Sequence, residues 1–106
     1  EIEIEIYETR VGKIFFDWIE GLKETHTRAK IFTRLDRLKL GNFGDCKSIG
    51  GGISELRIHY GPGIRTYYSK VGTKIVLLLC GGEKGSQKKD IKNAQAFLKD
   101  YKVRED

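Results

Sequence analysis

Residues 52–69 read Gly52-Ile-Ser-Glu-Leu-Arg-Ile-His-Tyr-Gly-Pro-Gly-Ile-Arg-Thr-Tyr-Tyr-Ser69, and this stretch predicts two β-strands joined by a tight turn. Apolar and polar residues alternate before the turn, with the period of two expected when one sheet face packs on a core and the other meets solvent. At the turn, Pro62 pre-sets one backbone angle, and the glycines on either side of it tolerate positive φ. We expect the rest of the chain to support this hairpin.

The hairpin carries an unusual set of polar side chains. By alternation, Glu55, Arg57 and His59 share one face of the first strand. Cross-strand pairing is expected to bring Arg65 and Tyr67 beside them. Such a surface suits single-stranded RNA, because cations engage phosphates and a tyrosine offers a stacking face. The alternative is a solvated face on which Glu55 and Arg57 form an ion pair that contributes little.

Length and composition predict one folded domain, residues 1–106. Hydrophobic side chains make up 39% of the chain and charged ones 33%, a balance that argues against an intrinsically disordered protein. No apolar run approaches the roughly 18 residues that cross a bilayer. The start, Glu1-Ile-Glu-Ile-Glu-Ile6, is unlike a signal peptide. We therefore expect a cytoplasmic protein with no membrane partner.

Cysteine and histidine usage predicts neither a metal nor a cofactor. Cys46 and Cys80 are too few for a disulfide framework and too isolated for a zinc site, which needs clustered ligands. His26 and His59 are also far apart in sequence. Because Cys80 ends an apolar run, we interpret it as a small core residue.

The net charge of +5 is unevenly distributed along the chain. Residues 1–25 hold three basic and seven acidic side chains, a net charge of −4, whereas residues 26–106 hold seventeen basic and eight acidic ones, a net charge of +9. This asymmetry favours an anionic partner for the later part of the chain, and nucleic acid is the commonest such partner. A solvated basic surface is the alternative.

One strand and two helices are predicted before the hairpin. Isoleucine alternates with glutamate over residues 1–6, which predicts a strand over residues 2–8 with one buried face. Gly21 is expected to end a first helix, whose apolar stripe is Phe15, Trp18, Ile19 and Leu22. A second helix, capped by Thr25 or Thr27 and ended by Gly41, has the stripe Ile31, Phe32, Leu35 and Leu38.

The remaining segments complete the predicted order β-α-α-β-β-β-α. Residues 41–52 are interpreted as a flexible glycine-rich loop. Residues 75–80 are apolar throughout, which predicts a central strand buried on both faces and ended by Gly81-Gly82. Ser86 is expected to cap a last helix that turns Ile91, Ala94, Leu98 and Tyr101 inward. The result is an α+β domain with a small, mainly antiparallel sheet, a two-helix hairpin and a C-terminal helix, its helices packed on one sheet face.

The hairpin residues could cleave RNA without a metal, because the ribose 2′-OH is an internal nucleophile close to the phosphorus. The reaction then needs cations for the phosphate oxygens and groups that accept and donate protons. Arg57 and Arg65 can supply charge with bidentate geometry. His59, Glu55 and Lys84 are the candidates for proton transfer.

Three segments resemble a known family. They are Ser54-Glu-Leu-Arg-Ile-His-Tyr-Gly-Pro-Gly-Ile-Arg-Thr-Tyr-Tyr68, Ile75-Val-Leu-Leu-Leu-Cys-Gly-Gly-Glu-Lys84 and Gln87-Lys-Lys-Asp-Ile91. Together they are similar to the RelE/HigB/ParE-like toxins of bacterial type II toxin–antitoxin pairs, and most to the HigB-like addiction module killer proteins. Leu40-Gly-Asn-Phe-Gly-Asp45 also matches that branch.

The resemblance implies a RelE-like fold and the activity of a ribosome-dependent mRNA endonuclease. It implies catalytic roles for Arg57, Arg65 and Lys84. Near the last helix, Lys88, Lys89 and Asp90 stand where other branches place a catalytic tyrosine or histidine, so His59, Tyr67 and Asp90 are all candidates for the general acid. The predicted RNA-binding residues are Glu55, His59, Tyr67, Lys88, Lys89 and Asp90.

Three functional hypotheses follow. The first is a toxin that cleaves mRNA on the ribosome without a metal and is neutralised by a cognate antitoxin, a helix-turn-helix protein similar to HigA, through which alone the toxin would contact DNA. The alternative is a ParE-like, non-enzymatic toxin that inhibits DNA gyrase. The third is a decayed toxin that acts mainly as an antitoxin-bound co-repressor.

Overall fold

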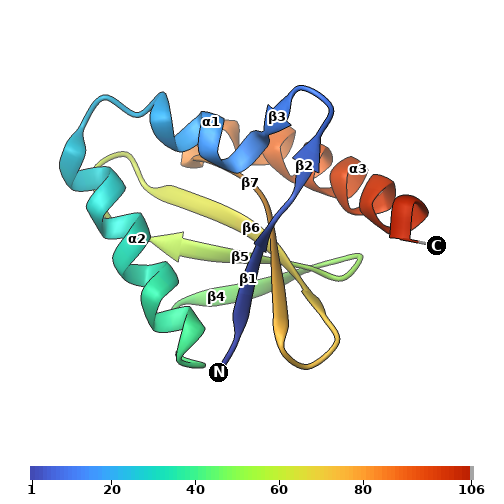
Figure 1. Ribbon diagram of the computed structural model, residues 1–106. Coiled ribbons are helices and arrows are strands. Elements are labelled where there is room, and N and C mark those ends of the chain that lie inside the picture. Colours follow the sequence, from blue (N-terminus) through green and yellow to red (C-terminus); the bar gives the residue numbers. More distant parts are fainter. Residues whose placement is uncertain (106) are drawn as a thin grey trace.

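The protein is a five-stranded sheet with helices on both faces, described for residues 1–105 by a computed structural model (Figure 1). The sheet order is β1-β7-β6-β5-β4, and only the β1–β7 pair is parallel. The strands are β1 (Glu3–Ile6), β2 (Glu8–Thr9), β3 (Gly12–Lys13), β4 (Cys46–Gly50), β5 (Ile53–Ile58), β6 (Ile64–Val71) and β7 (Ile75–Glu83). The helices are α1 (Ile14–Glu20), α2 (Thr25–Lys39), the short 3₁₀ helix η1 (Lys84–Ser86) and α3 (Gln87–Glu105).

The β5–β6 hairpin is confirmed. Antiparallel pairing runs from Ile53 opposite Ser69 to Ile58 opposite Ile64. Gly61 and Gly63 have positive φ angles of 57° and 86°, which residues with a Cβ rarely adopt. The expected alternation also holds at the core, because Leu56, Ile58 and Ile64 are buried on one face.

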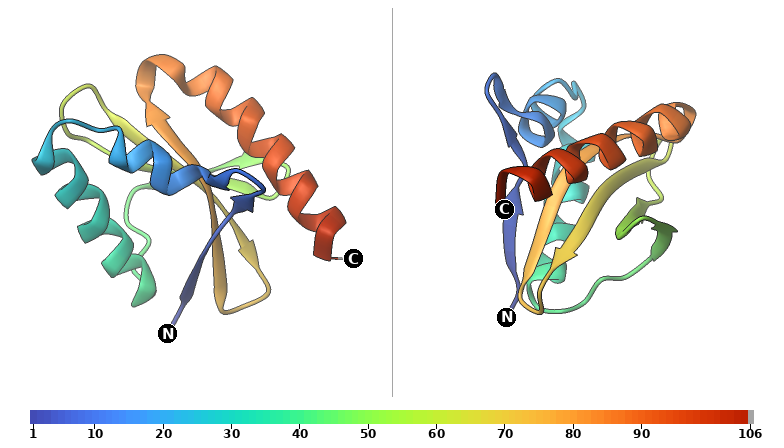
Figure 2. Two further views of the ribbon diagram at one scale, coloured as in Figure 1. Left: turned by 45° about the horizontal axis from the view of Figure 1, so that its top comes forward. Right: turned by 90° about the vertical axis from the view of Figure 1, so that its right-hand side faces the viewer.

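Two apolar cores lie on opposite faces of the sheet. Helices α1 and α2 pack on one face, with Phe15, Ile19, Ile31 and Leu35 in the first core. Helix α3 packs on the other face through Ala94 and Leu98 (Figure 2). The prediction of helices on one face only was therefore wrong. Figures 1 and 2 also show α1 and α2 diverging at a wide angle rather than forming an antiparallel hairpin.

Strand β7 continues through the two glycines that were expected to end it. A Cβ on Gly81 would collide with the ring of Trp18, and one on Gly82 would collide with the carboxylate of Asp90. Because successive residues of a strand face opposite ways, the two glycines admit one side chain on each face of the sheet. The glycine pair therefore permits close packing and leaves the strand intact.

Further sequence predictions need correction. Part of the predicted glycine-rich loop forms β4, which pairs with β5 and makes one edge of the sheet. The small β2–β3 hairpin was also missed, so the true element order differs from the predicted one. Glu24, rather than a threonine, caps α2 by accepting a hydrogen bond from the main-chain N–H of His26. Phe32 is 44% exposed and is not a core residue.

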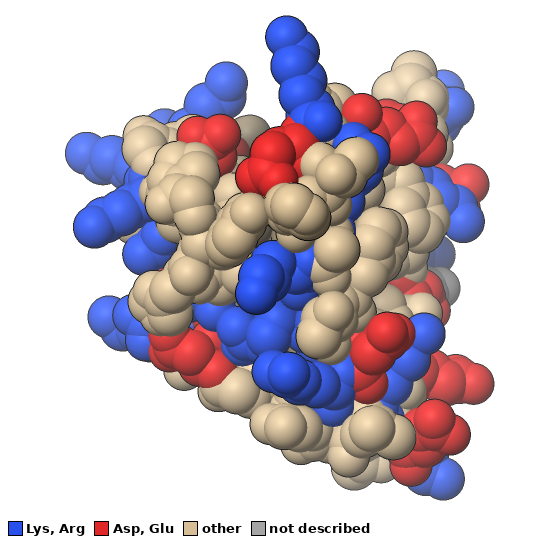
Figure 3. Space-filling view, turned by 90° about the vertical axis from the view of Figure 1, so that its left-hand side faces the viewer, with Lys and Arg blue, Asp and Glu red and all other residues tan. Residues whose placement is uncertain are grey.

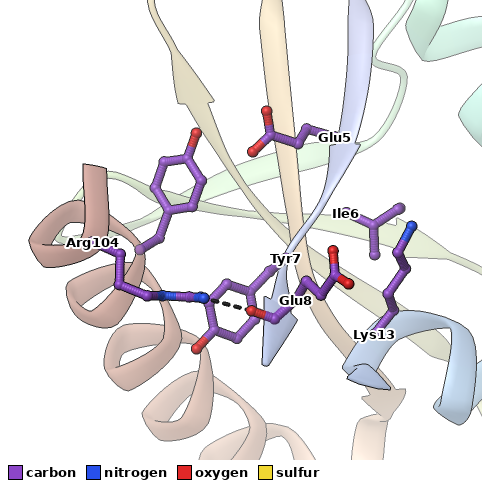
Figure 4. A pocket seen from close by; sticks show the side chains of 7 residues that line it. Glu5, Ile6, Tyr7, Glu8, Lys13 and Arg104 are labelled. Carbon is purple, nitrogen blue, oxygen red and sulfur yellow. Dashed lines mark hydrogen bonds between the residues drawn. The ribbon is translucent and has the colours of Figure 1, made fainter. Parts of the chain in front are cut away.

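The last turns of α3 lie beside the end of β1 and the start of β2, around a pocket of about 330 Å³ (Figure 4). The Tyr7 hydroxyl donates a hydrogen bond of 2.6 Å to Asp100. Arg104 donates one of 2.6 Å to the main-chain oxygen of Glu8, and its guanidinium lies 5.4 Å from the Tyr7 ring centroid. These contacts fasten α3 to the N-terminal segment. Within residues 1–105, no helix combines the length and apolar character that crossing a membrane requires.

Candidate functional site

The hairpin register brings the predicted site residues together on the α3 side of the sheet. Arg57 lies opposite Arg65, and Glu55 lies opposite Tyr67. Strand β7 places Gly82 on the other side of Arg65. Only the short helix η1 separates β7 from α3, and the first residue of α3, Gln87, reaches this cluster.

Glu55 is the buried centre of the cluster, with 1% of its surface exposed. One carboxylate oxygen accepts a hydrogen bond of 2.7 Å from the Gln87 amide and lies 3.4 Å from Arg65 Nε. The other oxygen lies 3.9 Å from Arg57 Nε. A buried carboxylate is costly unless it is paired, so the two arginines make its burial possible.

This burial corrects two predictions. The polar face of β5 was expected to meet solvent, and Glu55 was expected to contact RNA. Instead α3 covers this part of the face, and the Glu55 carboxylate is inaccessible to a ligand. Its action is on Arg57 and Arg65, whose Nε atoms lie closest to it, and of their outer nitrogens Arg57 Nη2 is paired with Asp45.

Asp45 joins the cluster to His59. Its carboxylate accepts a hydrogen bond of 2.9 Å from Arg57 Nη2, and its other oxygen lies 2.5 Å from His59 Nε2. The pKa of Asp45 lies below its ordinary value, mainly through the hydrogen bond to His59, with further lowering by Arg57. Since an ionised carboxylate only accepts, His59 Nε2 carries the hydrogen, which leaves Nδ1 of the neutral ring as an acceptor.

Arg34, which lies on α2 on the opposite side of the sheet, holds the loop that carries Asp45. Its guanidinium donates to the main-chain oxygens of Arg57 at 2.6 Å, Phe43 at 3.2 Å and Asp45 at 3.5 Å. A Cβ on Gly44, where φ is 65°, would lie 2.7 Å from Arg34 Nη2. The loop therefore wraps closely around the guanidinium, which fixes the position of Asp45. Neither Asp45 nor Arg34 was predicted to be a site residue, because hydrophobic periodicity carries no information about their roles.

Arg65 and Lys84 approach each other at Gly63. The main-chain N–H of Lys84 donates a hydrogen bond of 2.9 Å to the Gly63 oxygen. A Cβ on Gly63 would lie 3.5 Å from both Arg65 Nη1 and the Cβ of Lys84. The Arg65 side chain is 13% exposed, that of Arg57 is 31% exposed, and Lys84 is fully on the surface. The structure thus brings the three predicted catalytic cations together, while their catalytic roles remain predictions.

Tyr67 and Asp90 are less accessible than their predicted roles require. Tyr67 is fully buried, and its hydroxyl finds no hydrogen-bond partner among the described residues. Burial raises its pKa, and the charges of Glu55 and Asp90 raise it further. Tyr67 therefore cannot stack on RNA in this conformation. Asp90 accepts a hydrogen bond of 2.5 Å from Ser86 and packs against Gly82.

The first turn of α3 adds two lysines to the site. Lys88 and Lys89 are exposed and follow Gln87, whose amide contacts Glu55. In the described part of the chain, no three or more His, Cys, Asp and Glu side chains form a group that could hold a metal ion. The carboxylate at the outer edge of the site, that of Asp45, is already paired with Arg57 and His59. The groups that face outward are therefore mostly cations and an imidazole, which suit a phosphodiester anion.

Fold and site together define a small α+β domain with a cluster of basic side chains at one end of its sheet. The chain belongs to the phage-derived Gp49-like protein family (DUF891), whose model matches residues 17–102. It is also 46% identical over 86 residues to an uncharacterized protein of Haemophilus influenzae, across 81% of this chain and 87% of the relative.

The family assignment corrects the resemblance stated from the sequence. Gp49-like proteins are a family distinct from RelE and HigB, so the assignment to the RelE/HigB/ParE-like toxins was wrong. The segments that carried the resemblance form a hairpin, an inner strand and the start of a helix, a pattern that did not distinguish the two families. Gp49-like proteins are often toxin-like members of toxin–antitoxin systems.

Proposed function

We propose that this protein is the toxin of a toxin–antitoxin pair and cleaves mRNA on the ribosome. The observation that carries the proposal is the paired Arg57 and Arg65. They lie next to the buried Glu55 and beside the hydrogen-bonded pair of Asp45 and His59. The family supports the toxin role, since its members are often toxin-like. The excess of positive charge after residue 25 supports an anionic substrate.

The two arginines position the scissile phosphate. Their Nε atoms face Glu55, so the outer guanidinium nitrogens can donate to the non-bridging oxygens. Because the guanidiniums are fixed before substrate arrives, they need little reorganisation as charge develops in the transition state. Lys84, Lys88 and Lys89 add positive charge at the rim, which favours binding of the neighbouring phosphates.

His59 is the general base in this proposal. Its Nδ1 takes the proton of the ribose 2′-OH, whose oxygen then bonds to phosphorus while the bond from phosphorus to the 5′ oxygen breaks. Lys84 gives a proton to that leaving oxygen. The products are a 2′,3′-cyclic phosphate and a 5′-OH end, and no metal takes part. Tyr67 is too buried to act as the acid, and Asp90 is engaged by Ser86.

A cognate antitoxin completes the proposal. A helix-turn-helix antitoxin would cover the cationic site and would provide the only link between the toxin and DNA. Its removal frees the arginines for RNA.

The test uses purified translating ribosomes programmed with a defined mRNA. We expect new ends inside translated codons, a 2′,3′-cyclic phosphate on one fragment and a 5′-OH on the other, and no cleavage when the scissile nucleotide carries 2′-deoxyribose. Cleavage of the deoxy-substituted message would contradict the 2′-OH mechanism. Intact transcripts together with DNA breaks in cells expressing the protein would instead support a non-enzymatic gyrase inhibitor.

A further inference from the structure

A second basic surface lies on the α2 side of the molecule. An open groove of about 560 Å³ runs between α2 and the end of β5. Lys30, Arg34 and Arg37 line it from the helix, and Ile58 and Tyr60 line it from the strand. Figure 3 shows this side of the molecule, with several lysine and arginine side chains over the middle of the face.

The positive charge of the groove is not neutralised by its own walls. Within the described chain, no aspartate or glutamate is among the lining residues. Arg34 donates to main-chain oxygens rather than to a carboxylate, and Lys30 Nζ lies 5.5 Å from the Tyr60 ring centroid. The Glu24 carboxylate contacts Tyr60 and His26 at one end of the groove.

The groove adjoins the candidate site. His59 belongs to the site and its neighbour Tyr60 lines the groove, so the end of β5 separates the two. Arg34 spans this boundary, since it binds the main-chain oxygens of Arg57 and Asp45. An extended chain lying in the groove can therefore continue past the β5–β6 turn to the arginine pair.

We propose that the groove binds the single-stranded RNA that flanks the cleaved phosphodiester, an inference that rests on the proposed function. Lys30, Arg34 and Arg37 are spaced four and three residues apart, so the mean interval between them along the helix axis is about 5 Å. This interval is comparable to the separation of neighbouring phosphates in an extended strand. The repeated cations beside the site favour a polyanion that is continuous with the substrate over an unrelated acidic protein segment.

The test measures binding separately from cleavage. The probe is a short fluorescent single-stranded RNA with 2′-O-methyl riboses, which cannot be cut. We expect the double variant Lys30→Glu/Arg37→Glu to bind it roughly tenfold more weakly than the matched control Lys99→Glu/Lys102→Glu, which makes the same charge change at the far end of α3. The slope of log affinity against log salt should also fall by roughly one to two.

Equal affinity of the two double variants would overturn the inference. A second probe, polyglutamate, separates RNA from an acidic protein: loss of polyglutamate binding with unchanged RNA binding would also overturn it. If thermal melting shows that the reversal variant is unfolded, Lys30→Ala/Arg37→Ala replaces it with the same criteria. If the wild-type protein binds RNA through the groove but cleaves no message, the proposed function fails and the groove assignment stands.

Discussion

The two faces of the β5–β6 hairpin bury different kinds of side chain, apolar on one face and charged on the other. On the α1/α2 face, Leu56, Ile58 and Ile64 join an apolar core. On the α3 face, the same strands bury a carboxylate between two arginines. Apolar burial stabilises the fold, whereas burial of charge costs free energy unless it is closely compensated. The comparison indicates that one face maintains the structure and the other maintains a site.

Arg65→Lys should give the largest effect. Lysine keeps a positive charge beside Glu55 but lacks the guanidinium fork, so we expect cleavage to slow roughly a hundredfold to a thousandfold. Single-turnover cleavage on programmed ribosomes measures this rate. Arg10→Lys, at an exposed position, is the matched control and should cleave at the wild-type rate. An unchanged rate for the Arg65 variant would remove the guanidinium from the chemistry.

Leu56→Ala tests the opposite face. The side chain is fully buried, so we expect the free energy of unfolding to fall by about 3 kcal/mol. The cleavage rate of the folded protein should stay within about twofold of wild type, because the substitution leaves every charged contact in place. Urea denaturation measures the stability, with the exposed Val103→Ala as the control. A large loss of activity at a temperature where the variant is folded would break the division between the faces.

Glu55→Gln should have the opposite effect to Leu56→Ala, with a larger change in the cleavage rate than in the stability. The amide keeps the shape and can still bond Gln87, but it no longer attracts the arginines, so cleavage should slow roughly tenfold, the scale on which supporting partners act at other sites. The melting temperature should fall less than in Leu56→Ala, because the arginines that lose their partner are partly exposed and Arg57 keeps Asp45. Glu55→Asp, which keeps the charge, is the matched variant. Parallel loss of stability and rate would mean that Glu55 acts only on the fold.

Asp45→Asn should give the smallest effect, a cleavage rate lower by a few fold, because the His59 ring loses its carboxylate partner.

Low pH should have a related effect on the wild-type protein. The pKa of Asp45 lies below its ordinary value of 3.8, so the pairing is present above that value and is lost as the pH falls through the depressed pKa. NMR of the His59 ring should report this transition below pH 3.8 in the wild type and not in Asp45→Asn. A transition unaffected by the substitution would remove Asp45 as its cause.

Periodicity predicted the parts of the fold that burial on one face dictates. The β5–β6 hairpin, the inner strand β7 and the α3 stripe of Ile91, Ala94, Leu98 and Tyr101 follow from alternation or from helical spacing. The split of the helices between two faces did not follow, because a stripe shows that a helix is buried but not on which face of the sheet. Strand β4 was missed because its side chains are mostly exposed, which leaves little apolar pattern to detect.

The candidate site was predictable only where local alternation controls it. Arg57 and Arg65 were placed together because paired strands align residues of the same face. The role of Glu55 was wrong because its burial depends on Gln87, far away in sequence. Asp45 and Arg34 act through a loop whose course depends on main-chain hydrogen bonds, and side-chain pattern carries no information about those bonds.

The contact between Gln87 and Glu55 has a consequence for biosynthesis. The helix that begins at Gln87 is the last element of the described chain to be translated, and domains made on the ribosome gain structure from their N-terminal end. The arginines consequently acquire their final setting only after the rest of the sheet exists. A nascent polypeptide that lacked α3 would therefore carry the sheet without a completed site.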